Sequence, residues 1–242
     1  MGSVMKRYCL LFLGWVALSA RAEITEQQIE ADCLKIASYS AQGGDHYRRR
    51  DYAKARELYE QQAAWSESCQ LDDARIATAY NNVALTYIRE GDYLKARAWL
   101  QLMPDDSKSV HNLGLIEDKL PAALAEVSAS AEGEYWQYAG KSLWSVIRIG
   151  REGRGHRLDF EGYYPGLMAM YYGPNIGEFS ASLDLSSGHA RYSMAEGGEG
   201  DLDCVYDFSA GKDALEVTRL SGNWCGFGHN VSAEGKYVKV GR

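Results

Sequence analysis

Four cysteines are the residues of this chain whose types and spacing most clearly indicate chemistry. Cys33 and Cys69 lie in a stretch rich in Ala, Gln, Glu and Leu, and Cys204 and Cys225 lie in a glycine-rich stretch near the C-terminus. The fifth cysteine, Cys9, lies in the N-terminal segment that we expect to be removed as a signal peptide. The even number that remains in the exported chain is typical of disulfide bonds, and four cysteines allow three pairings. Their positions favour the local pairing, Cys33–Cys69 with Cys204–Cys225. Each bond would stabilise the fold by about 3 kcal/mol.

Metal binding is the alternative use of such residues. Zinc sites commonly contain a C-x-x-C pair, which this chain lacks, and only His229 lies close in sequence to one of these cysteines. An acidic run at residues 196–203 resembles a calcium-binding repeat but has Leu202 where the repeat needs an aspartate. We therefore expect no metal and no cofactor.

Two carboxylates could cleave a glycosidic bond. Asp159 and Glu161 lie two residues apart in an expected strand, so their side chains share a face. Glycosidases use such a pair, although an exposed strand edge is the ordinary explanation. The chain has no G-x-S-x-G, H-E-x-x-H or Walker motif. The sequence therefore predicts a protein that is not an enzyme, with a carbohydrate-active enzyme in the strand-rich part as an alternative.

The first 22 residues are typical of a cleaved signal peptide. Lys6 and Arg7 precede an apolar run at residues 8–20, and Ala20-Arg21-Ala22 supplies a cleavage site. The run is too short to span a bilayer as a helix, so we expect no stable membrane anchor. Together with the cysteines, this segment predicts a periplasmic protein.

Composition excludes several classes of protein. The 242 residues contain 26 Lys and Arg against 33 Asp and Glu, and the net charge of −7 leaves no excess of cations for binding nucleic acid. A hydrophobic share of 46% with 25 glycines and 4 prolines fits a globular protein. Helix-forming residues dominate positions 23–132, and glycine with alternating apolar residues dominates positions 133–242. The order predicts an α+β protein with a helical domain followed by a β domain.

An internal repeat organises the helical part. The pattern D-Y-x-K-A-R occurs at residues 51–56 and 92–97, and in each copy apolar or small residues follow at helical spacing. Residues 73–90 form another predicted helix, which Gly91 ends. The unit is therefore a helical hairpin.

These residues resemble the tetratricopeptide repeat. The second copy carries the family's spaced positions Tyr80, Val83, Ala84, Tyr87, Gly91, Tyr93, Ala96, Leu100 and Pro104. The first copy has Arg50 at the usual glycine and His46 at the usual tyrosine, and a degenerate third copy is expected from residue 112. The spacing of the two copies exceeds the family's period by roughly seven residues. We place these extra residues at 66–72.

The resemblance implies a curved array whose concave face binds a protein segment. Candidate binding residues on the helix at 73–90 are Asn81, Asn82, Leu85 and Arg89. A clamp for a terminal carboxylate is not expected, because Ser40 and Gly44 stand where the first repeat would supply partners. A scaffold that buries this face against the β domain is the alternative.

The second half has the pattern of an antiparallel sheet. Strands are predicted at residues 143–149, 157–164, 179–185, 189–195, 204–208, 215–220 and 237–240, with a turn at 150–155. Seven or eight short strands indicate a meander, a sandwich or a small barrel. Asn223 to Gly228 and Gly235-Lys236-Tyr237 weakly resemble the β domain of periplasmic lysozyme-inhibitor-like proteins.

Aromatic residues of this half are candidates for binding. Trp136, Tyr138 and Trp144 are expected to pack in the core or between the domains. Loops are expected to expose the rings of Tyr163, Tyr164, Tyr171 and Tyr172.

The function predicted from the sequence is non-catalytic binding of a protein partner in the periplasm. The narrower hypothesis is an immunity protein or inhibitor that neutralises a toxin or a lysozyme-type cell-wall enzyme, because an anionic surface attracts cationic partners. An assembly factor for an envelope or secretion complex is the alternative.

Overall fold

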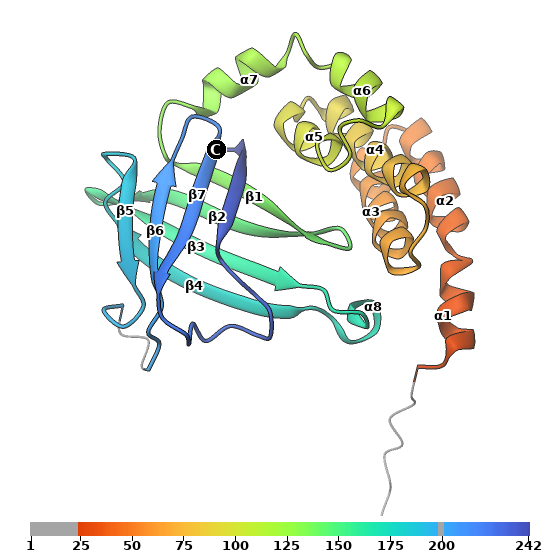
Figure 1. Ribbon diagram of the computed structural model, residues 1–242. Helices are drawn as coiled ribbons and strands as arrows, with labels where there is room; N and C mark the ends of the chain where they lie inside the picture. Colours follow the sequence, from red (N-terminus) through yellow and green to blue (C-terminus); the bar gives the residue numbers. More distant parts are fainter. Residues whose placement is uncertain (1–23, 198–200) are drawn as a thin grey trace, which may run out of the picture.

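The computed structural model describes residues 24–197 and 201–242, an arc of helices followed by a barrel-like sheet (Figure 1). The predicted signal peptide lies outside the described residues. Helices precede strands along the chain, so the expected α+β fold is confirmed. The helices before the sheet are α1 (Glu26–Cys33), α2 (Ile36–Arg48), α3 (Tyr52–Ser68), α4 (Asp73–Glu90), α5 (Tyr93–Leu100), α6 (Ser107–Gly114) and α7 (Leu120–Val127).

Both copies of D-Y-x-K-A-R begin the second helix of a hairpin. The Asp51 side chain caps α3 by accepting a hydrogen bond from the Lys54 backbone N–H, and Asp92 stands at the same place before α5. Helix α2 packs against α3, α3 against α4, and α4 against α5. The predicted helix at residues 73–90 is confirmed, whereas residue 112, expected to begin a third unit, lies inside α6.

The turns of the two hairpins share an uncommon backbone conformation. Gly91 ends α4 with a φ of 82°, and Arg50 precedes Asp51 at the equivalent place with a φ of 63°. This left-handed conformation costs a residue with a side chain about 1–2 kcal/mol, whereas glycine adopts it readily. The first hairpin therefore has the same turn conformation as the second, with arginine in place of glycine.

The strands form one antiparallel sheet that curls into a nearly closed barrel. In space their order is β4-β3-β2-β1-β8-β7-β6-β5, so the meander closes where β8 pairs with β1. The edges β4 and β5 face each other, and Tyr192 stacks on Phe179 across this seam at 5.7 Å. The strands are β1 (Gly133–Gly140), β2 (Leu143–Glu152), β3 (Gly155–Tyr164), β4 (Asn175–Leu183), β5 (His189–Ser193), β6 (Val205–Ala210), β7 (Ala214–Ser221) and β8 (Gly235–Gly241), with a short helix α8 (Ala169–Tyr172) between β3 and β4.

Two details of the sheet differ from the expectation. Strand β1 was not predicted, because both of its faces are buried: Tyr135 points into the barrel core and Trp136 packs toward the helices. A strand buried on both faces has no alternation of apolar and polar residues. The turn expected at residues 150–155 is shorter, since β2 continues to Glu152 and β3 begins at Gly155.

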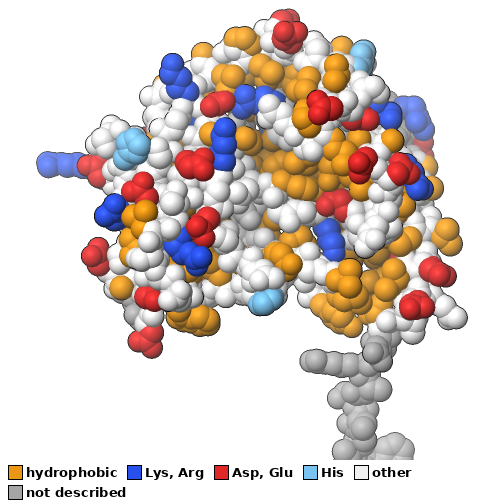
Figure 2. Space-filling view, in the orientation of Figure 1, with side chains coloured by type: hydrophobic (Ala, Val, Ile, Leu, Met, Phe, Trp, Pro, Cys, Tyr) orange, Lys and Arg blue, Asp and Glu red, His pale blue; other side chains and the backbone are white. Residues whose placement is uncertain are grey.

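Two hydrophobic cores share the sheet. One fills the barrel, and the other lies between the helices and the outer face of β1, β2 and β8. Figure 2 shows hydrophobic side chains gathered where the helical arc meets the barrel. There Trp99 of α5 packs edge-on against Tyr138 and Trp144 at 5.9 and 5.4 Å, which confirms the expected packing role of these aromatic residues.

A carboxylate joins the helices to the sheet. Glu67 of α3 accepts hydrogen bonds from the Tyr138 hydroxyl and from the backbone N–H of Lys141, the latter at 2.7 Å. Lys141 and Ser142 form the β1–β2 turn with φ angles of 50° and 63°, and the Ser142 hydroxyl donates to the Glu60 carbonyl oxygen at 2.8 Å. Such turns normally contain Asn and Gly. The contacts with α3 offset the cost of the two left-handed residues.

Helix α1 is held to the rest of the molecule by few contacts. The Cys33–Cys69 disulfide joins it to the end of α3, as predicted. Asp32 accepts a hydrogen bond from the Tyr171 hydroxyl of α8 at 2.9 Å, and the Tyr171 ring packs against Trp65 of α3. Hydrogen bonds from Gln28, Lys35 and Tyr171 lower the pKa of Asp32 to about 2. Helices α1 and α8 therefore brace each other against α3.

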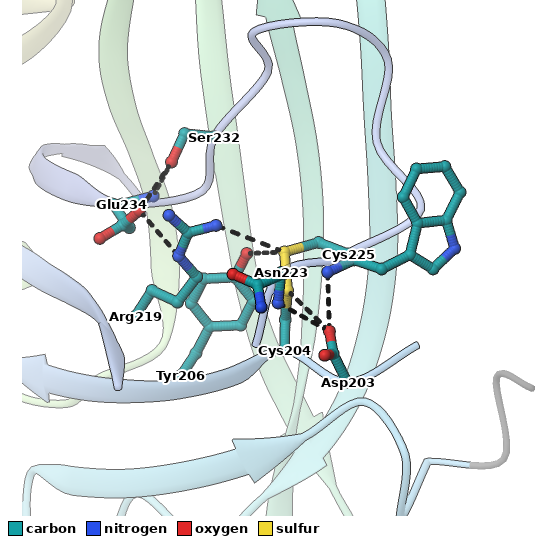
Figure 3. Close-up of a disulfide and its surroundings, with 9 residues drawn as sticks. Asp203, Cys204, Tyr206, Arg219, Asn223, Cys225, Ser232 and Glu234 are labelled. Atoms are coloured by element: carbon teal, nitrogen blue, oxygen red, sulfur yellow. Dashed lines mark hydrogen bonds and ion pairs between the residues drawn. A yellow bond between two sulfur atoms is a disulfide. The ribbon is translucent and has the colours of Figure 1, made fainter. Parts of the chain in front are cut away.

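The Cys204–Cys225 disulfide fixes the loop between β7 and β8, again as predicted. Figure 3 shows the Tyr206 hydroxyl and the Arg219 guanidinium beside the Cys225 sulfur, at 3.2 and 3.9 Å. Asp203 accepts hydrogen bonds from two backbone N–H groups of the loop, at residues 223 and 224. This part of the loop is therefore built around the disulfide.

Exchanging the residues of the two equivalent turns tests whether the turns are the same. Arg50→Gly should raise the free energy of unfolding by about 0.5–1 kcal/mol, because it relieves the left-handed backbone. Gly91→Arg should lower it by about 1 kcal/mol, since no atom lies within 4 Å of an added Cβ and only the backbone conformation resists the change. Urea unfolding measures both values, and a loss of stability in Arg50→Gly would contradict the shared geometry.

Candidate protein-binding groove

A groove of about 400 Å³ lies between α2 and α4, with α3 as its floor. Its apolar side chains include Leu34, which is 82% exposed at the rim. Small and polar residues widen it, and one wall carries the cation Arg75. The lining residues are Cys33, Leu34, Ile36, Ala37, Ser40, Gln62, Ser66, Leu71, Arg75 and Thr78.

Gln62 offers the groove a hydrogen-bond donor. The residue is only 6% exposed, and its Oε1 accepts a hydrogen bond from Asn82 Nδ2 at 3.0 Å. Its Nε2 has no hydrogen-bond partner among the described residues. Ser66 and Thr78 donate to carbonyl oxygens of their own helices. A ligand with a backbone carbonyl could therefore bind Gln62 without displacing an internal hydrogen bond.

The candidate residues predicted on α4 fall on two sides of this helix. Asn82, Leu85 and Arg89 continue the helical spacing of Arg75 and Thr78, so they lie on the stripe that borders the groove. Arg89 donates from Nε to the Tyr47 hydroxyl at 2.8 Å, which connects α4 to α2 beyond the groove. These three residues therefore share the groove side of α4.

Asn81 has a structural role. It is 2% exposed, donates to the Ala77 carbonyl oxygen and to Ser109, and accepts from Asn112. Its side chain therefore joins α4 to α6 and is not presented to a ligand. A sequence cannot distinguish Asn81 from Asn82 until the position of α6 is known.

The four candidate tyrosines fall into two pairs, one engaged in contacts within the protein and one exposed. Tyr163 lies in β3 and donates to Glu161, and Tyr171 binds Asp32 as described above. Tyr164 and Tyr172 are exposed as expected, but they are the last residues of β3 and α8 and do not lie in loops. They are the two of this set that could meet a partner directly.

The outer face of the sheet contains the candidate carboxylates. Asp159 and Glu161 line a shallow depression with Arg148, Glu178 and Ser180. Burial raises the pKa of Asp159, but hydrogen bonds from Ser180 and Arg157 outweigh it, so that the pKa is lowered. A general acid needs a raised pKa. These contacts supply no argument for glycoside cleavage.

Glu60 is a half-buried acid near the helix–sheet junction. Burial raises the pKa of its carboxyl to about 7, although the nearby Arg56 opposes the shift. Arg56 pairs with Glu90 and lies over the Tyr87 ring, 4.2 Å from its centroid. The Glu60 carboxyl therefore carries a proton over part of the physiological pH range.

Sequence reasoning missed most of the groove. Leu34, Gln62 and Leu71 come from separate segments, and the Cys33–Cys69 bond brings these segments together. The cysteine pairing was the available signal, because it places the end of α1 against the enlarged connection before α4.

Neither membrane-spanning helices, nor metal clusters, nor known relatives identify the protein. Within residues 24–197 and 201–242, none of the helices combines the length and the apolar character that crossing a bilayer requires. The same residues contain no group of three or more side chains arranged to hold a metal ion, and part of the acidic run at 196–203 lies outside them. No protein-family model, curated protein or solved structure matches this chain.

The Glu60 carboxyl should make stability depend on pH. Between pH 4.5 and about 7, the folded protein keeps the proton on the Glu60 carboxyl. The unfolded chain, in which this carboxyl has its ordinary pKa of 4.5, has released it. The free energy of unfolding should therefore fall as pH rises through this window. In Glu60→Gln this fall should be smaller, and melting temperatures at pH 5, 6 and 7 measure the difference. Parallel curves for the two proteins would contradict the assignment.

Proposed function

We propose that this chain is a non-catalytic binding protein that holds an extended segment of a partner protein in the groove between α2 and α4. The main support for this proposal is the groove. There, apolar side chains surround the Gln62 Nε2 donor, which has no hydrogen-bond partner among the described residues. Alternating apolar contacts and main-chain hydrogen bonds suit an extended peptide. Asn82, Leu85 and Arg89 would extend the contact along α4.

The helical hairpins support this function by their arrangement. Two hairpins begin their second helices with the same motif, and each has a left-handed residue at the same place in its turn. We attribute them to a short tetratricopeptide-like array, in which such a groove faces a ligand. The same attribution accounts for small residues such as Ala37 and Ser40 along the groove.

The compartment follows from the disulfides. Two disulfides suggest an oxidising environment, and with the predicted signal peptide they support the periplasm. There an anionic binder without an evident catalytic site could act as an antagonist. The narrower proposal is an immunity protein or inhibitor whose partner is a toxin or a cell-wall enzyme.

Affinity capture with a groove-filling variant tests the proposal. The chain from residue 23, immobilised and exposed to a bacterial envelope extract, should retain an envelope-acting enzyme or a toxin and lower its activity. Ala37→Trp should lose the captured protein, because an indole ring would occupy the groove.

Ala53→Trp is the matched control. Ala53 is exposed on α3 and does not line the groove, so this variant should retain the partner. Equal capture by both variants would show that the groove is not the binding site. Capture of no protein, or of proteins that keep full activity, would contradict the antagonist role.

A further inference from the structure

We infer that the uncharged segment at residues 163–176 is a docking surface for a cationic protein. It is separate from the groove between α2 and α4 and would act whether or not the groove binds a segment. No charged residue occurs between Glu161 and Glu178, and the sixteen intervening residues include four tyrosines, two methionines and two prolines.

This segment exposes large apolar side chains at one end of the barrel. Leu167 is 78% exposed and Tyr172 is 69% exposed, and Tyr164 and Ile176 are also exposed. Figure 2 shows hydrophobic side chains gathered at the place that α8 occupies in Figure 1. Contiguous exposed apolar side chains of this kind mark interaction sites, whereas a single exposed leucine does not.

The segment is held rigidly in place. The Lys141 ammonium donates to the carbonyl oxygens of Gly166 and Leu167 at 2.7 and 3.1 Å. Tyr171 is fixed by Asp32 and Trp65, so α8 is tied to the sheet and to the helices at once. Exposed anchors on a fixed backbone lose little conformational entropy on binding, which favours a protein interface.

The charges beside the segment select a cationic partner. Glu161 and Glu178 lie directly opposite each other on β3 and β4, an arrangement that is destabilising in the isolated protein. Arg148 approaches Glu161 at 3.6 Å, whereas Glu178 has no ion-pair partner among the described residues. The nearby Lys141 is occupied by the two carbonyl oxygens, and Lys35 is paired with Asp32 at 2.7 Å. An unpaired carboxylate therefore borders the apolar surface.

The same charges disfavour other occupants. An anionic lipid surface and a second copy of this chain, whose net charge is −7, would both bring negative charge to Glu178. A partner that combines apolar and basic side chains satisfies both the exposed rings and the carboxylates. Charge complementarity of this kind mainly sets specificity and the rate of association.

A designed peptide of alternating leucine and lysine provides the probe. Its binding to the chain from residue 23 is measured by fluorescence anisotropy at two salt concentrations. Leu167→Ser with Tyr172→Ser should weaken binding about tenfold, which corresponds to the loss of about 1.4 kcal/mol of apolar contact. Glu178→Gln should weaken binding less and make it less sensitive to salt.

Two control variants separate this surface from others. Val110→Ser with Leu115→Ser removes two exposed apolar side chains at α6 and just beyond it, and should bind the peptide as the unchanged chain does. Ala37→Trp fills the groove and should also bind normally. Loss of binding in Ala37→Trp alone would show that the peptide binds in the groove. It would overturn the inference that residues 163–176, here called the α8 surface, are the docking site.

Other outcomes would also overturn the inference. Equal weakening in the α8 and α6 double variants would show non-specific attraction. Equal binding of a leucine–glutamate peptide would exclude a preference for cations. Binding to phosphatidylglycerol vesicles that depends on Leu167 and Tyr172 would identify a lipid surface. A dimer in ultracentrifugation that the α8 variant abolishes would identify a second copy of the chain.

Discussion

The Glu67 carboxylate is the contact on which the arrangement of the whole molecule depends. It accepts hydrogen bonds from the Tyr138 hydroxyl and the Lys141 backbone N–H, and so fixes the β1–β2 turn against α3. Tyr138, Trp144 and Trp99 then pack edge to face beside it, and one hydrophobic core runs from the helices onto the outer face of the sheet. The half-buried carboxylate would lose both of these hydrogen bonds if the turn moved away from α3, so the turn and the helix position each other.

This junction also decides which surfaces remain open. The opposite side of α3 forms the floor of the groove, because the side that bears Glu60 and Glu67 is occupied by the sheet. Lys141, at the same turn, holds the backbone beside α8 through the carbonyl oxygens of Gly166 and Leu167. One hairpin therefore fixes the positions of both the groove and the α8 surface. The groove is apolar and contains a hydrogen-bond donor, whereas the α8 surface is apolar and bordered by carboxylates.

The sequence predicted what depends on local patterns. The cysteine pairing, the helix at residues 73–90 and the repeated motif were readable because each depends on spacing along the chain. Strand β1 was missed since burial on both faces removes alternation. The difference between Asn81 and Asn82, like that between Tyr171 and Tyr172, depends on which neighbour lies across from each side chain. Such differences depend on tertiary packing, and so does the groove, whose walls come from three helices.

Site-specific photo-crosslinking from the groove tests directly whether the partner binds there. A benzophenone amino acid in place of Thr78 would lie on the wall of the groove, and one in place of Ala53 would lie outside it. With the captured partner present, position 78 should cross-link to one contiguous segment of the partner, and position 53 should not. Cross-links from position 53 alone, or from neither position while the complex remains intact, would contradict binding in the groove.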